Sequence, residues 1–134
     1  MRLSVVGFVL ASGLIAGAGM ASAQDAGSVK FYNEKVVPVF QANCYRCHGG
    51  LNHRGGLTMD TKAGIMKGGH DGVVLVPGHP ESSLLVKLIR HEGPPDDPKP
   101  MPPKSPRMSD ADIAVIEQWV KAGAVMPNDS PPAQ

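Results

Sequence analysis

Two cysteines and a histidine stand within five residues of one another, in the order Cys44-x-x-Cys47-His48. On a helical turn, residues three and four apart share one face, so the two thiols and the imidazole can reach a single bound group. The spacing is the attachment pattern of c-type haem, in which both thiols bond to the vinyl groups of one porphyrin and the imidazole faces the iron. The motif therefore predicts one covalent haem c, with Cys44 and Cys47 as thioethers and His48 as an axial ligand.

Two other chemistries also use closely spaced cysteines. A redox-active Cys-x-x-Cys pair normally follows a strand of an α/β fold, and no segment of this sequence alternates convincingly with period two. A zinc site needs a second pair of cysteines or histidines at short spacing. The remaining histidines are scattered singly and are expected to be solvated: His53, His70, His79 and His91. Haem attachment is therefore favoured over both alternatives.

A haem iron held by His48 has a sixth position, where a soft thioether would favour the reduced state. Five methionines follow the N-terminal segment: Met59, Met66, Met101, Met108 and Met126. Most methionines fill gaps in cores, and this is the expectation for Met59 and Met108. Met101 differs because the prolines on both sides fix its backbone in a stiff loop. We expect Met101 to be the sixth ligand; Met108, a histidine such as His91 and an open site are the alternatives.

Composition predicts one small, loop-rich domain. The 134 residues include 16 glycines and 13 prolines, while only 4% are aromatic. Such a chain has a modest core, so a bound cofactor should be needed for folding. The formal net charge of +1 gives no electrostatic footprint of a nucleic-acid-binding protein. We expect an all-α fold in which helices and long Gly/Pro-rich loops wrap around one haem.

The N-terminal segment is typical of an export signal. Arg2 precedes a long uncharged apolar run, and Ala21-Ser22-Ala23 supplies the small-x-small site of a signal peptidase. Residues 1–23 are therefore predicted to be a signal peptide cleaved after Ala23, which places the mature chain in the periplasm or otherwise outside the cytoplasm, without membrane insertion. An uncleaved anchor is the alternative, because the run is about long enough to span a bilayer.

The rest of the chain divides into a flexible lead-in over residues 24–30, one domain over residues 31–126 and a disordered tail over residues 127–134. Apolar residues from Phe31 to Phe40 predict a helix leading toward the cysteines. Pro38 should kink this helix or mark its first turn.

Later helices are predicted from caps and apolar stripes. Frequent glycines make residues 49–78 a wrapping loop, with a short helix over residues 61–67. A second helix should begin at His79-Pro80-Glu81 and end at Gly93, followed by a stiff, extended segment from Pro94 to Pro106 that contains seven prolines. A third helix should be capped by Ser109 and end at Gly123. One face of this helix is apolar: Ile113, Ile116, Trp119 and Val120.

Beyond the cysteine motif, the chain resembles the monohaem, class I type cytochromes c, and specifically the planctomycete-type cytochrome c domain. The resemblance covers about residues 31–126. The matching pieces are Gly55-Gly56-Leu57-Thr58-Met59-Asp60-Thr61, Val76-Pro77-Gly78, Pro80-Glu81-Ser82-Ser83-Leu84-Leu85, Met101-Pro102-Pro103 and Ala122-Gly123-Ala124 after Trp119. It implies His48 and Met101 as axial ligands, a helix-rich fold around one haem, and electron carriage. His70 and His79 depart from the residues expected there.

We interpret the protein as a monomeric one-electron carrier, not an enzyme, that serves redox partner proteins. A haem sensor or peroxidase-like enzyme with an open or labile sixth site is the alternative, and an assembly module with a structural haem is a third. A two-haem peroxidase would need a second Cys-x-x-Cys-His motif, which is absent. Trp119 should anchor the core or donate to a haem propionate, and Arg54 and Lys104 are either exposed charges or propionate partners.

Overall fold

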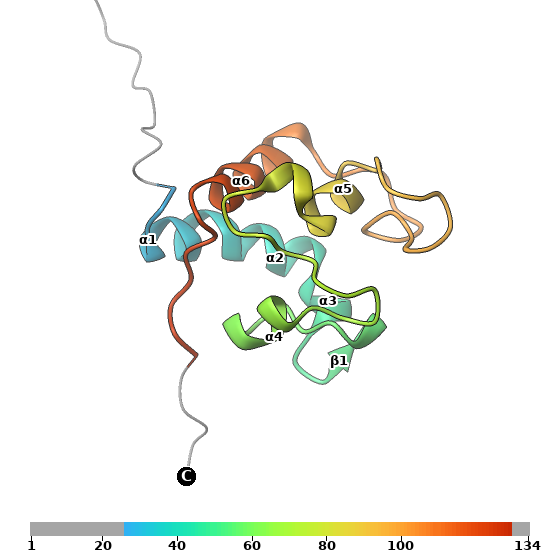
Figure 1. Ribbon diagram of the computed structural model, residues 1–134, viewed down its shortest axis with the longest axis horizontal. Coiled ribbons are helices and arrows are strands. Elements are labelled where there is room, and N and C mark those ends of the chain that lie inside the picture. The colour runs from blue at the N-terminus through green and yellow to red at the C-terminus, as the bar shows by residue number, and fades with distance from the viewer. Residues whose placement is uncertain (1–25, 130–134) are drawn as a thin grey trace, which may run out of the picture.

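The computed structural model describes residues 26–129, so the predicted signal peptide and the last five residues lie outside it. The described chain is mostly helical, as expected, with one short strand (Figure 1). Its α-helices and strand are α1 Val29–Phe31, α2 Val37–Asn43, α3 Tyr45–His48, β1 Asn52–His53, α4 Lys62–Lys67, α5 Leu84–Ile89 and α6 Asp110–Lys121. A π-helix spans Tyr32–Val36, and 3-10 turns span Arg54–Gly56 and Pro80–Ser82. No helix between residues 26 and 129 has both the length and the apolar character of a membrane span.

The helix expected before the cysteines is one continuous run made of α1, the π-helix and α2. Val37 donates its N–H to the carbonyl of Tyr32, five residues back, which widens the turn. Pro38 follows at once in the first turn of α2, where its missing N–H is tolerated. The expected irregularity at Pro38 is therefore a π turn immediately before it.

Both ends of the described chain make defined contacts. Near the first, Ala26 is buried and Ser28 caps α1 by accepting the N–H of Phe31 at 3.0 Å. At the other end, Asp129 accepts the N–H groups of Lys62 and Ala63 at 2.6 and 2.8 Å. This carboxylate satisfies free donors at the start of α4. The flexibility predicted for residues 24–30 and 127–134 stays a prediction.

The second predicted helix is shorter than expected and divided. Ser83 separates the 3-10 turn from α5, and its buried hydroxyl donates to the carbonyls of Val76 and His79 and accepts the N–H of Val76. Helix α5 ends at Ile89 instead of Gly93. His91 has φ of 58°, a left-handed conformation that no α-helix continues through.

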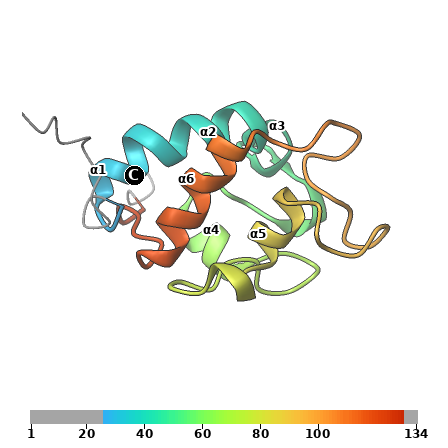
Figure 2. The same ribbon diagram turned by 90° about the horizontal axis from the view of Figure 1, so that it is seen from above.

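Helix α6 has the bounds and buried face that the sequence predicts. Ser109 accepts the N–H of Asp112 at 3.1 Å, and the buried residues are Ile113, Ile116, Trp119 and Val120. Trp119 lies 5.6 Å from both Phe40 and Tyr32 between ring centroids. Helix α6 thus crosses the first helical run, with α5 on its other side (Figure 2).

The proline-rich segment leaves this helical core and turns back to it (Figures 1 and 2). Residues 94–106 contain no helix or strand, but they bend repeatedly instead of running straight as expected. The amide of Met101 donates to the carbonyl of Leu88 at 3.1 Å. This bond brings the middle of the segment against the end of α5.

Candidate functional site

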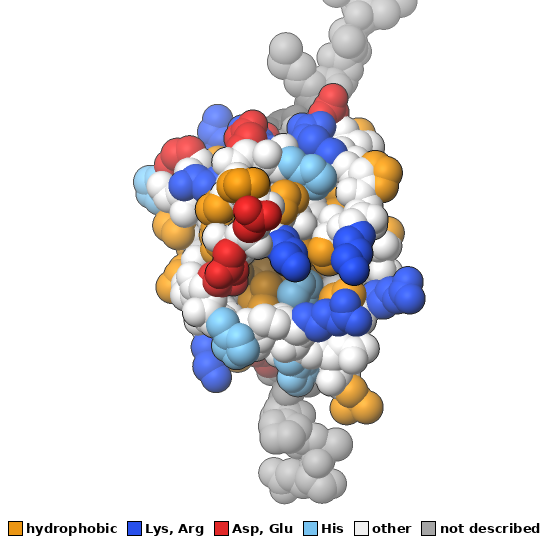
Figure 3. Space-filling model, turned by 90° about the vertical axis from the view of Figure 1, so that its right-hand side faces the viewer, with side chains coloured by type: hydrophobic (Ala, Val, Ile, Leu, Met, Phe, Trp, Pro, Cys, Tyr) orange, Lys and Arg blue, Asp and Glu red, His pale blue; other side chains and the backbone are white. Residues whose placement is uncertain are grey.

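A cavity of about 720 Å³ opens between α3, α5, the proline-rich segment and the start of α6. Figure 3 shows a hollow floored by hydrophobic side chains, with basic residues gathered along one side and acidic residues along the other. The volume lies within the range of small-molecule and cofactor sites. Five sulfur-containing side chains line it: Cys44, Cys47, Met59, Met101 and Met108.

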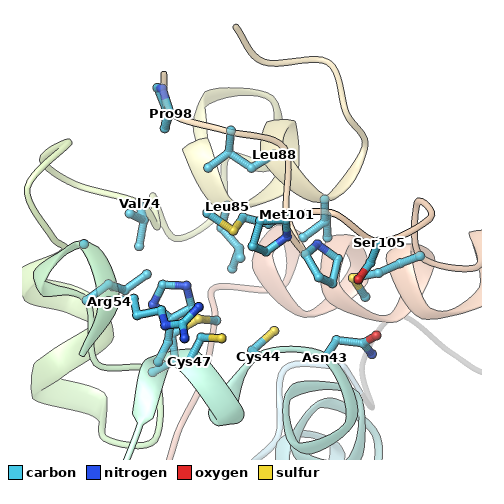
Figure 4. A pocket seen from close by; sticks show the side chains of 18 of the residues that line it. Asn43, Cys44, Cys47, Arg54, Val74, Leu85, Leu88, Pro98, Met101 and Ser105 are labelled. Atoms are coloured by element: carbon cyan, nitrogen blue, oxygen red, sulfur yellow. The ribbon is translucent and has the colours of Figure 1, made fainter. Parts of the chain in front are cut away.

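The floor of the cavity is the turn that carries the cysteine motif. The N–H groups of Cys47 and His48 both donate to the carbonyl of Cys44, at 3.0 and 2.9 Å. This tight turn brings both thiols to one wall (Figure 4), and His48 lines the same cavity. All three motif residues therefore line the same cavity, as the spacing predicts.

The imidazole of His48 is in a state suited to bind a metal. Burial lowers the pKa of this imidazole, while the nearby backbone of Leu57 and Arg54 raises it by less. Metal ligation requires neutral imidazole. Within residues 26–129, its buried Nδ1 atom has no hydrogen-bond partner, and an unsatisfied buried nitrogen beside a cavity is typical of a site completed by a ligand.

The thiol of Cys44 does not suit the rival chemistries. Burial raises its pKa to about 12, with a smaller contribution from the charge of Cys47. Redox exchange and zinc binding both use the thiolate, which forms when the pKa is lowered. No cluster of three or more potential metal-binding His, Cys, Asp or Glu side chains exists in the described part of the chain. The arrangement therefore disfavours both a redox-active disulfide and zinc.

The roof of the cavity includes Met101, whose sulfur lies above the two cysteines in Figure 4. Met59 and Met108 belong to the buried core, as expected, but they also line the cavity. Two other methionines and His91 are not among its lining residues. The structure thus brings together Met101 and its alternative Met108, but not His91.

Charged residues line the cavity in an arrangement that the sequence reveals only in part. Arg54, which the sequence suggests as a propionate partner, lines the cavity together with Arg46, Arg107 and Asp71. Lys104, the other residue suggested, does not. Arg46 stands inside the cysteine motif, which is the one signal that could have suggested it. Trp119 is fully buried and donates its indole N–H to the carbonyl of Val125 at 2.9 Å. It is therefore a core anchor, and this donor is not available to a propionate.

Residues 44–105 match the family model of planctomycete cytochrome C. Over these residues the chain is similar to planctomycete cytochrome C. The matched segment begins at the first cysteine of the motif and extends beyond Met101, so it includes most of the cavity wall. No curated protein and no solved structure gave a significant match.

Similarity to this family implies covalently bound haem c, and the cavity residues of the chain fit that group. Two thiols at the required spacing face the cavity beside an imidazole with an unpartnered nitrogen. Three arginines and one aspartate give the wall two net positive charges, which would balance the two propionate carboxylates of one haem.

Proposed function

We propose that this protein is an exported cytochrome c, a one-electron carrier that holds a single haem c. In this proposal Cys44 and Cys47 form the thioethers, and His48 and Met101 are the axial ligands of the iron. The observation that supports it most strongly is that all four side chains line one cavity, although Met101 is more than fifty residues away from the cysteines in sequence.

Bound haem c supplies a one-electron couple, while the protein orients the group and sets its surroundings. His48 is kept neutral by burial and presents nitrogen from the floor. The thioether of Met101 presents a soft donor that favours reduced iron. Leu85, Leu88 and Ile89 form an apolar wall that limits access of water. A site in which the protein would fill both axial positions of the iron suits electron transfer better than substrate binding.

The proposal includes export and a monomeric state. Cleavage after Ala23 would release the chain outside the cytoplasm, where covalent haem attachment takes place, and the mature carrier would exchange electrons with redox partner proteins. The intact mass of the exported protein should then correspond to Gln24–Gln134 plus one haem. A membrane-bound form that retains Met1 would instead support the anchor interpretation.

Replacing Met101 tests the function, because electron transfer without catalysis depends on a filled sixth position. The oxidised wild-type protein should show the weak long-wavelength sulfur-to-iron charge-transfer band, and its ferrous form should resist carbon monoxide at neutral pH. Met101→Ala should abolish the band, allow carbon monoxide to bind and lower the reduction potential, because a ligand that favours the reduced state is lost.

Met108→Ala is the matched control, since it removes a second thioether from the same cavity. It should preserve the band and the resistance to carbon monoxide, while lowering the free energy of unfolding by about 2–5 kcal/mol as a buried methionine is truncated. Loss of the band in this variant would reassign the ligand to Met108. Ready binding of carbon monoxide by the wild type would favour the sensor or peroxidase-like enzyme.

A further inference from the structure

Arg107 is the cavity arginine whose guanidinium is fixed by hydrogen bonds. Its Nε donates to the backbone carbonyl of Arg90 at 3.2 Å, and its Nη1 donates to the carboxylate of Asp110 at 2.6 Å. The first contact reaches the end of α5 and the second the start of α6. Arg107 is therefore oriented at the cavity wall before any ligand binds.

A guanidinium has five N–H groups, so three remain after these two bonds are made. The remaining donors lie on Nη1 and Nη2, where the planar fork matches the two oxygens of a carboxylate. The pair with Asp110 is solvent-exposed and worth little in free energy, but it limits the rotation of the fork. Arg107 thus has both free donors and a fixed orientation.

The other cations near the cavity lack this arrangement. Within the described part of the chain, the side chains of Arg46 and Arg54 make no hydrogen bond or ion pair. Arg54 lies close enough to His48 for its charge to help lower the pKa of the imidazole, so it belongs to the floor. Lys104 is not part of the wall. Arg107 instead lies on the wall that contains Met108 and Ser109.

We propose that Arg107 binds one propionate carboxylate of the haem and so links the cofactor to the end of the methionine-bearing segment. The inference rests on the proposed function. Arg107 directly follows the proline-rich segment, and its bond to the Arg90 carbonyl is made close to the bond between Met101 and Leu88. A carboxylate held by Arg107 would therefore hold this segment closed over the cavity.

The test is the pH dependence of the reduction potential of the haem-loaded protein between about pH 5 and pH 8, a range that begins above the ordinary pKa of a carboxyl group. In the wild type the propionate bound by Arg107 should stay ionised throughout, so that only the second propionate of the haem can change the potential with pH. In Arg107→Gln the propionate should titrate within this range, and the potential should fall as the pH rises, since a new negative charge favours oxidised iron. Arg107→Lys keeps the charge without the fork and should give a smaller slope.

Two charge-matched variants make the test specific. Lys104→Gln removes a positive charge from the same segment outside the cavity wall, and its potential should show the same pH dependence as that of the wild type. A steeper slope in Arg54→Gln than in the wild type, with no change in Arg107→Gln, would place the propionate at Arg54 and overturn the inference. Equal slopes in the wild type and in Arg107→Gln would also overturn it. Haem content, measured on the same samples by mass and by the pyridine haemochrome spectrum, separates these results from failure of the proposed function, in which no covalent haem would be found.

Discussion

The helical core and the cavity wall are stabilised in different ways. In the core, the side chains of Val36, Phe40 and Trp119 are at most 1% exposed and are covered by one another and by their neighbours. In the wall, Met101 and Leu84 pack against the core on one side and face the cavity on the other. The core side chains are thus buried by one another, whereas the wall side chains become fully covered only by what the cavity binds.

This difference separates residues that determine stability from residues that determine chemistry. Core side chains meet each other directly, so truncating one should weaken folding without altering the iron site. Wall side chains that hold the cofactor, such as Met101, meet the haem directly, so truncating one of them should alter the spectrum before it alters the fold. Removal of the cofactor gives the largest expected effect, because it affects the whole wall at once.

Cys44→Ala combined with Cys47→Ala should release the haem and prevent cooperative folding. Without haem, a cavity of about 720 Å³ has no occupant to pack against, and a small loop-rich chain has little other core. We expect weak helical circular dichroism and no cooperative melting transition. Amide exchange should show protection lost first in the proline-rich segment and retained longest in α6. A sharply melting apo-protein would show that the wall folds unaided.

Trp119→Ala is expected to have the largest effect of any single substitution in the core. Loss of a fully buried tryptophan should lower the free energy of unfolding by about 3–5 kcal/mol, measured by denaturant titration of the haem-loaded protein. Trp119→Phe is the matched control, because it retains a ring next to Phe40 and Tyr32 but leaves the Val125 carbonyl without its donor. Both variants should keep the wild-type haem spectrum while folded. A changed spectrum in Trp119→Phe would show that the two regions are not independent.

Sequence patterns predict the core better than the wall for a physical reason. Helix α6 follows from an apolar period and a serine cap, which are local features. Ser83 divides the second helix because its buried hydroxyl bonds to Val76 and His79, and no local periodicity reveals these bonds. Likewise, Arg107 reaches the cavity only because residues 94–106 fold back onto α5. Of the site, the sequence predicts the motif residues and Met101 from their spacing and the flanking prolines, and it suggests Arg54, but it does not indicate Arg107, which tertiary contacts bring to the cavity.

Asp129 joins two segments that are far apart in sequence, because it lies after α6 but caps α4. Asp129→Ala should lower the free energy of unfolding by about 0.5–2 kcal/mol, the usual cost of losing a cap. Lys62→Gln is the control, since it alters only the contact between the ammonium group and Asn128, and it should be nearly neutral. Equal stability of Asp129→Ala and the wild type would show that this contact contributes nothing in solution.

The two tyrosines of the chain connect the core to the back of the cysteine turn and give the smallest expected effect. Tyr45 lies within the motif and packs on Phe40 at 6.0 Å between centroids. Burial raises the pKa of both Tyr32 and Tyr45 above the ordinary value. The folded state therefore retains protons that the unfolded chain releases near its ordinary pKa of about 10. Stability should be unaffected at neutral pH and should fall as the pH rises above about 10.

Near-ultraviolet absorbance of tyrosinate, recorded alongside the haem spectrum during an alkaline titration, measures this effect. Both phenols should ionise only above the pH at which a free tyrosine ionises. Their ionisation should coincide with unfolding of the protein. Tyr45→Phe should halve the amplitude and reduce the alkaline loss of stability, since one of the two retained protons is gone. Ionisation at the ordinary pH with an unchanged haem spectrum would show that these rings are not enclosed. The self-packed core would then begin farther from the cysteine turn than these two tyrosines.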